Sequence, residues 1–391
     1  MTSSSLSSVH SRLAAVVSAA LLAALAGCGK SDGSAEFDKA SKAFAAHDLA
    51  KAEKLFAKSS QLAPANVDAL VMLALVRLDL GELQGARSAA VEASKLAPKD
   101  LDVVELQAQI AWHQKNYAAA RSLYARIALD RAADAARRSQ ALAGLGVVDM
   151  AMADSDKAAE WLRDRARTEF LQALALDYRN SSANYHLAYL YRHSYDSYEN
   201  AALSQYMRFV RFAPSVDDRV RKVQHTFIPE IKSSIDAGLA AIPGASSRNS
   251  GACANAMKQA EAAWKKGQYK TARLRYDEAL KADPLCYEAA AGLAAAWMKV
   301  DTTQNGQRKA YESYRRACRL SPFATDTHLA AAKLASKLSL HASAADLYSR
   351  ALSSRPRDLA AIDGLVASLK ASGNAKCADV YRRYRESVSG K

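Results

Sequence analysis

Few side chains in this sequence have the types and spacing that catalysis or metal binding requires. His186 and His193 are seven residues apart, which on a helix places them about 10 Å from each other along the axis, too far to share one ion unaided. The stretch 143–146 holds two glycines, but no Lys-Ser/Thr pair follows it and no strand precedes it. It therefore indicates close helix packing rather than a phosphate-binding loop.

A metalloprotease motif is also absent from the sequence, which contains no His-Glu-x-x-His helix. We therefore expect that the protein is not an enzyme and that it holds no metal ion and no dissociable cofactor.

The N-terminus has the layout of an export signal. A polar start is followed by the apolar run 13–24 and by Leu25-Ala26-Gly27-Cys28. An apolar run of about 12 to 15 residues is too short to cross a hydrocarbon layer of roughly 30 Å as a permanent helix. The four-residue end resembles the bacterial lipobox. That resemblance implies removal of residues 1–27, with a diacylglycerol and an N-acyl chain attached to Cys28.

The mature chain would then be anchored to a membrane without spanning it. Residues 28–35 are rich in Gly and Ser and are typical of a flexible tether. Gly29 resembles the residue found after the modified cysteine in lipoproteins that are released to the outer membrane. We expect an exported, membrane-anchored lipoprotein on the periplasmic side of the outer membrane.

Composition favours helix over strand. The 391 residues include 16 glycines and 8 prolines, and half of the residues are hydrophobic. The net charge of +14 is uneven, because residues 28–214 hold 24 basic and 23 acidic side chains whereas residues 215–391 hold 29 basic and 17 acidic ones. The second part, at +12, suggests an anionic neighbour.

A period of 34 residues runs through the chain. It separates Pro64 from Pro98 and Pro322 from Pro356. Six prolines each have an alanine twelve residues earlier, namely Ala52, Ala86, Ala202, Ala272, Ala310 and Ala344, and five of the six have an aromatic residue eight residues earlier. On a helix, residues four and seven apart share one face, so the small residue permits close approach and the ring fills the space beside it.

These residues resemble the tetratricopeptide repeat (TPR), a 34-residue helix-turn-helix unit. The resemblance implies an all-α, right-handed α-solenoid. About nine units are expected, starting near residues 33, 67, 101, 139, 181, 253, 287, 325 and 359. The fourth carries about eight extra residues ahead of Ala166, which we expect to lengthen its second helix.

The expected domain organisation follows from these units. An N-terminal TPR block covers 36–214, atypical helices broken at Pro229 and a linker cover 215–252, and a basic TPR block covers 253–391. The last unit has Arg382 and Arg385 on its outer face, as a solubilising cap would require.

The resemblance also implies a concave surface, lined by the first helices, that grips a peptide or a partner helix. In the fifth unit this surface would present Tyr185, His186, Tyr189, Arg192 and His193. Aromatic and arginine side chains are common in binding hot spots. Along the second block it would carry the basic stripe Lys258, Lys265, Lys299, Lys333, Lys337 and Lys370. Lysines in such a stripe attract carboxylates or phosphates through their charge.

The remaining cysteines are Cys253, Cys286, Cys318 and Cys377. Their spacing fits no zinc or redox motif. If one pair forms a disulfide, we expect Cys286 to bond with Cys253 or with Cys318, since all three lie near the same end of adjacent helix pairs. A disulfide needs Cα atoms within about 7 Å.

We therefore expect a lipid-anchored TPR scaffold for a cell-envelope assembly, such as pilus or secretin, polysaccharide-export or cell-wall machinery. Its partners would be envelope proteins or peptide segments, and association with further copies of the chain stays open. The alternative is a binder of anionic envelope polymer or lipid headgroups that uses the basic half. Nucleic acid is not an expected partner, because export removes the protein from the genome.

Overall fold

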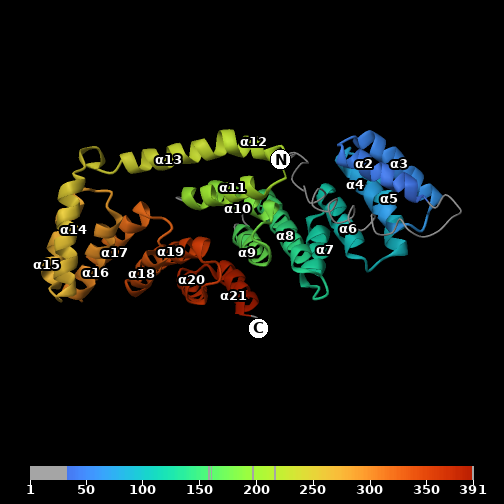
Figure 1. Cartoon of the computed structure of the whole chain (residues 1–391). Coiled ribbons are helices and arrows are strands. Elements are labelled where there is room, and N and C mark those ends of the chain that lie inside the picture. The colour runs from blue at the N-terminus through green and yellow to red at the C-terminus, as the bar shows by residue number, and fades with distance from the viewer. Residues whose placement is uncertain (1–32, 157–158, 160, 196–197, 215–216, 390–391) are drawn as a thin grey trace. The chain divides into compact units, whose positions relative to one another are not determined.

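The computed structural model describes residues 33–389 apart from 157–158, 160, 196–197 and 215–216 (Figure 1). Within this part every regular element is a helix, which confirms the predicted all-α class. No helix there is long and apolar enough to cross a membrane. The predicted signal peptide and Cys28 lie outside the described residues.

The chain divides into two compact units. The first takes the residues up to His186 together with Arg211–Asp217, and the second takes Leu187–Val210 together with Asp218 and all that follows.

Consecutive helices of the first unit pack in pairs, and the second helix of each pair packs against the first helix of the next. The pairs are α2 (Ser34–Ala45) with α3 (Leu49–Leu62), α4 (Val67–Asp79) with α5 (Leu83–Leu96), α6 (Leu101–His113) with α7 (Tyr117–Leu129), and α8 (Ala135–Ser155) with α9 (Trp161–Leu176). The extra residues of the fourth pair mostly extend its first helix, because α8 has 21 residues and α9 has 16. The expected lengthening of the second helix is thus a minor part of the change. Good helix formers at 150–153 allow α8 to continue.

The second unit repeats the same arrangement. Its pairs are α14 (Ser250–Lys265) with α15 (Tyr269–Ala282), α16 (Tyr287–Val300) with α17 (Gln304–Leu320), α18 (Thr325–Lys337) with α19 (His341–Ser354), and α20 (Leu359–Ala371) with α21 (Ala375–Ser389). In the sequence, α10 (Ser181–Ser194) and α11 (Glu199–Phe212) follow the first set of pairs and precede the second set. Seven of the nine predicted starting points fall within one residue of the start of a helix, and those near 139 and 253 do not.

The periodic small residues form the core. All six alanines of the 34-residue period are fully buried, and Phe56 and Tyr206 beside them are buried as well. At other helix contacts the small residue is glycine, because an aromatic ring lies against the helix backbone. A Cβ atom added to Gly292 would lie 2.5 Å from the ring of Tyr276, and one added to Gly364 would lie 2.3 Å from the ring of Tyr348. Helix pairing here depends on the absence of a side chain.

The atypical segment forms a nearly continuous helical stretch. It consists of α12 (Arg219–Lys222), the π-helical turn η3 (Val223–Phe227) and α13 (Ile228–Ala240), followed by the 3₁₀ turn η4 (Ala245–Ser247). Pro229 does not break the helix as expected. It lies in the first turn of α13, directly after the π-helical turn, and the residues on both sides of it remain helical.

One contact in the second unit joins residues far apart in the sequence. The Tyr198 hydroxyl donates a hydrogen bond of 2.9 Å to the Ser349 hydroxyl on α19. The Arg350 guanidinium lies 5.0 Å from the centre of the Tyr198 ring. Tyr198, just ahead of α11, is buried by these contacts.

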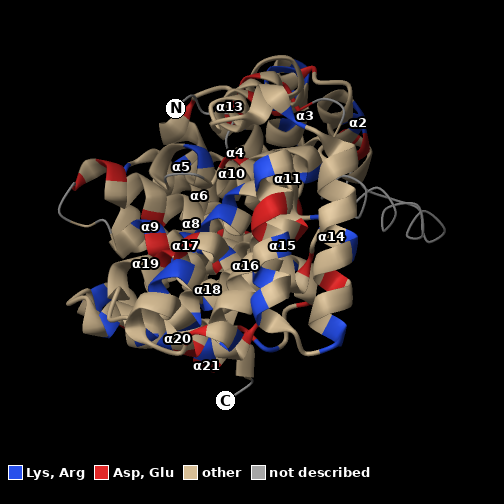
Figure 2. Cartoon of the chain, turned by 90° about the vertical axis from the view of Figure 1, so that its left-hand side faces the viewer, with Lys and Arg blue, Asp and Glu red and all other residues tan. Residues whose placement is uncertain are grey.

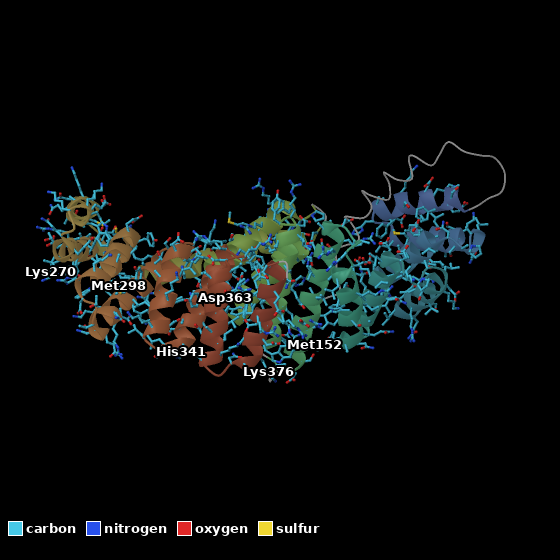
Figure 3. All side chains as sticks on the ribbon, turned by 90° about the horizontal axis from the view of Figure 1, so that it is seen from below. Met152, Lys270, Met298, His341, Asp363 and Lys376 are labelled. Atoms are coloured by element: carbon cyan, nitrogen blue, oxygen red, sulfur yellow. The ribbon has the colours of Figure 1, made fainter. Side chains whose placement is uncertain are left out.

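The last helix has a charged outer face. Arg385 on α21 donates a hydrogen bond of 2.6 Å to Asp363 of α20, one of the residues labelled in Figure 3. Arg382 forms ion pairs with Asp379 and Glu386 of its own helix. Tyr381 and Tyr384 fill the opposite, buried face.

Candidate protein-binding surfaces

Helix α10 carries all five of the residues predicted to grip a partner. The division between the compact units falls inside this helix, between His186 and Leu187. Tyr185 and His186 therefore belong to the first unit, and Tyr189, Arg192 and His193 to the second.

In the first unit, His186 is a packing residue. Its side chain is 4 % exposed, and its ring stacks on the ring of Phe170 with centroids 6.0 Å apart. The half-buried Tyr185 presents its edge to the same imidazole at 5.1 Å. Only Tyr185 of this pair leaves part of its surface for a partner.

In the second unit, Tyr189 and His193 lie one helical turn apart with ring centroids 4.3 Å from each other. Tyr189 is half-buried and His193 is exposed. Partial burial and the neighbouring Arg192 cation lower the pKa of His193, so its ring is neutral at physiological pH. A neutral imidazole beside a phenol ring offers aromatic surface together with hydrogen-bonding groups.

Arg192 is engaged by the chain itself. Its guanidinium forms an ion pair with Glu230 and lies 4.4 Å from the centre of the Phe227 ring. Phe227 also packs against Tyr206 of α11, with centroids 5.4 Å apart. The sequence pattern did not predict these contacts, because the segment 215–252 lacks the repeat period that defines neighbouring positions elsewhere.

The six predicted lysines all lie on first helices of the second unit. Lys258 and Lys265 are on α14, Lys299 is on α16, and the other three are on α18 and α20. All six are exposed, and none forms an ion pair with another described residue. Lys and Arg positions, coloured blue, recur along α14 and α15 (Figure 2). The ammonium groups of the six lysines remain available to an anionic ligand.

The first unit holds a buried ionic cluster that the sequence did not reveal. Asp149 of α8 is fully buried and accepts hydrogen bonds from Arg121 of α7 and Arg165 of α9. Arg121 also donates to Glu169 of α9 at 3.0 Å. Burial and the Asp149 charge raise the pKa of Glu169 well above its usual range, although the two arginines oppose this shift.

An open hollow of about 490 Å³ lies between α4 and α5 of the same unit. Leu70, Leu73 and Val91 contribute apolar surface to it, and Arg77 and Arg87 contribute charge. Arg77 is already paired with Glu53 at 2.7 Å. Among the described residues no group of His, Cys, Asp or Glu is arranged to hold a metal ion.

Two segments of the chain match models of the tetratricopeptide repeat family. They cover residues 43–110 and 257–325, one in each unit. Among curated proteins, none is significantly similar to this chain.

Solved structures give more distant likenesses. A TPR protein from Thermus thermophilus is 20 % identical, with a TM-score of 0.41, and the match covers 49 % of this chain and 97 % of that one. The Pseudomonas aeruginosa protein pilF is 16 % identical, with a TM-score of 0.40 and coverage of 54 % and 93 %. The Cut9 and Hcn1 assembly of the APC/C gives 14 % identity, a TM-score of 0.38 and coverage of 99 % and 83 %.

The matched segments share the features that the structure shows throughout both units. Each consists of consecutive helix pairs with buried alanines at the closest contacts. Together, the two family matches and the paired helices show that each compact unit of the chain contains tetratricopeptide repeats.

Proposed function

We propose that this protein is a non-enzymatic, lipid-anchored scaffold that recruits a protein partner to an assembly at the cell envelope. TPR units serve protein–protein interactions in general, which supports the recruiting role. The lipobox-like sequence ending at Cys28 supports the anchor and the export to the periplasmic face of the outer membrane.

The recruiting role rests on the side chains that α10 exposes in the second unit. Tyr189 and His193 combine aromatic surface with an exposed imidazole, as residues at binding hot spots do. We expect a peptide or helix of a partner to pack against them. Arg192 contributes less, since Glu230 and Phe227 hold it in place.

Crosslinking in intact cells, followed by purification and mass spectrometry, tests this role. The Tyr189→Ala variant should lose one stoichiometric envelope protein while its helical content stays unchanged. Met207→Ala on α11, where Met207 is 54 % exposed, provides a control in the same unit and should retain the partner. The Cys28→Ala variant should lose the partner through mislocalisation. An unchanged set of partners in Tyr189→Ala would contradict the assignment of this surface.

The basic stripe supports a second function, the binding of anionic polymer or lipid headgroups. The six exposed lysines lack ion pairs with other described residues, and the region from 215 onward carries a net charge of +12. Binding through such a stripe weakens as salt screens the charges.

Vesicles that contain phosphatidylglycerol provide the probe for this second function. Changing Lys265, Lys299, Lys333 and Lys337 to Gln should abolish salt-sensitive binding. A control with the same change of charge replaces Lys39, Lys42, Lys51 and Lys54, which are also exposed, and should keep it. Equal losses in the two variants would show that net charge, and not the stripe, determines binding.

A further inference from the structure

Two of the four described cysteines lie beside each other where the C-terminal helix pairs begin. Cys253 is in the first turn of α14 and is 5 % exposed. Cys286 precedes α16 and occupies its N-cap position. The neighbouring Cys253 thiol contributes to a raised pKa of Cys286, and both side chains pack in one apolar cluster.

Backbone hydrogen bonds fix both cysteines at the C-terminal end of α15. The Asn249 side chain caps α14 by accepting from the Ala252 N–H at 2.9 Å, and the Asn249 N–H donates to the carbonyl of Ala282 at 2.8 Å. The Cys286 N–H donates to the carbonyl of Asp283 at 3.1 Å. The proximity of the thiols is therefore built into the local backbone.

We propose that Cys253 and Cys286 form a disulfide bond when the chain meets a small-molecule disulfide of the glutathione class. One cysteine thiolate attacks a sulfur of oxidised glutathione, whose S–S bond breaks and releases the first glutathione thiol. The second cysteine then attacks the mixed disulfide and releases the second glutathione. The two protein thiols lose two protons and two electrons in total, and one glutathione disulfide becomes two thiols.

The structure distinguishes between the two partners that the sequence left open for Cys286. Cys318 on α17 lies near the charged side chains of Asp346 and Arg350 on α19. Its thiol is buried among those elements, and Cys377 is buried in α21. Cys253 is the neighbour that the geometry assigns to Cys286.

The bond would connect helices that are not direct neighbours in the packing order. Helix α14 packs on α15, and α15 packs on α16. A disulfide would join α14 to the start of α16 directly and close a loop of 33 residues. Closing such a loop restricts the unfolded chain and so favours the folded state.

Burial raises the pKa of Cys286 to about 12. The thiolate is the attacking species, so the folded protein should react slowly at neutral pH and faster as the pH rises. Refolding in the presence of the oxidant avoids this barrier, because the thiols are then still exposed.

The test uses the full chain, either refolded with oxidised glutathione or incubated folded at pH 8.5. After the free thiols are alkylated, the protein is digested with trypsin without reductant and studied by mass spectrometry. Each described cysteine falls in a separate tryptic peptide, with Cys253 in 249–258 and Cys286 in 282–299. We expect these two peptides to be linked, while Cys318 and Cys377 are alkylated.

A second measurement compares thermal unfolding with and without dithiothreitol. The oxidised chain should unfold roughly 5 °C above the reduced one. This difference should vanish in Cys286→Ser and persist in the matched variant Cys318→Ser. The proposal is overturned if Cys253 and Cys286 remain alkylatable after both treatments, carry separate glutathiones, or link to other cysteines. These outcomes do not depend on the lipid anchor or on any partner.

Discussion

At the scale of single residues, Glu169 is a side chain whose charge depends strongly on the fold. Its pKa is raised by burial and by Asp149, so the folded state binds its proton more tightly than the unfolded state does. The stability that this group contributes is fully present below the unfolded pKa near 4.5 and is lost as the pH rises through the raised folded value.

Glu169→Gln should remove this dependence on pH, because glutamine stays neutral. Urea unfolding at pH 5 and pH 8 should show that the wild type loses more stability between these values than the variant does. The exposed Glu82→Gln serves as a control and should behave as the wild type does. Parallel pH profiles for Glu169→Gln and wild type would mean that the folded protein keeps Glu169 ionised.

At the scale of the elements, the turn inside six of the helix pairs places one residue in the left-handed region, and the spacing is 34 positions from His47 to Gly81 to Lys115 and from Ser339 to Gly373. Gly81 has a φ of 79° and Gly373 one of 82°, whereas His47, Lys115 and Ser339 adopt the same conformation with side chains. The left-handed conformation costs a residue with a side chain about 1 kcal/mol, whereas glycine adopts it without this cost.

Ser339→Gly should therefore stabilise the second unit by roughly 0.5 to 1 kcal/mol, since glycine's greater freedom in the unfolded chain offsets part of the gain. Gly373→Ser, at the equivalent turn 34 residues later, should destabilise it by a similar amount. The free energy of unfolding in urea measures both. Shifts of the same sign in the two variants would show that the turn conformation does not control the effect.

The helix pairs were predictable because the residues that pack between the helices recur at a fixed spacing in the sequence. Alanine, an aromatic residue and proline recur at constant offsets, and all six alanines of that pattern are fully buried. Contacts between residues outside this repeat pattern could not be predicted, because no fixed spacing in the sequence marks them. The Tyr198 to Ser349 hydrogen bond joins residues 151 positions apart, and the pairing of Arg192 with Glu230 involves the segment that interrupts the repeats.

At the scale of the whole molecule, stability should be distributed locally. Most contacts run between consecutive helices, so each pair is stabilised mainly by its neighbours in the sequence. A defect in one unit should raise local opening there without affecting distant pairs.

Gly146→Ala provides such a defect in the first unit. The added Cβ would lie 2.5 Å from the ring of Phe170, so α8 and α9 must separate slightly. Hydrogen exchange should show faster amide exchange in α7, α8 and α9, with α18 to α21 unchanged. Gly364→Ala, whose added Cβ meets Tyr348, should produce the reverse pattern. Faster exchange along the entire chain in either variant would show that the protein unfolds as one cooperative body, because only then does a local defect lower the protection of every helix.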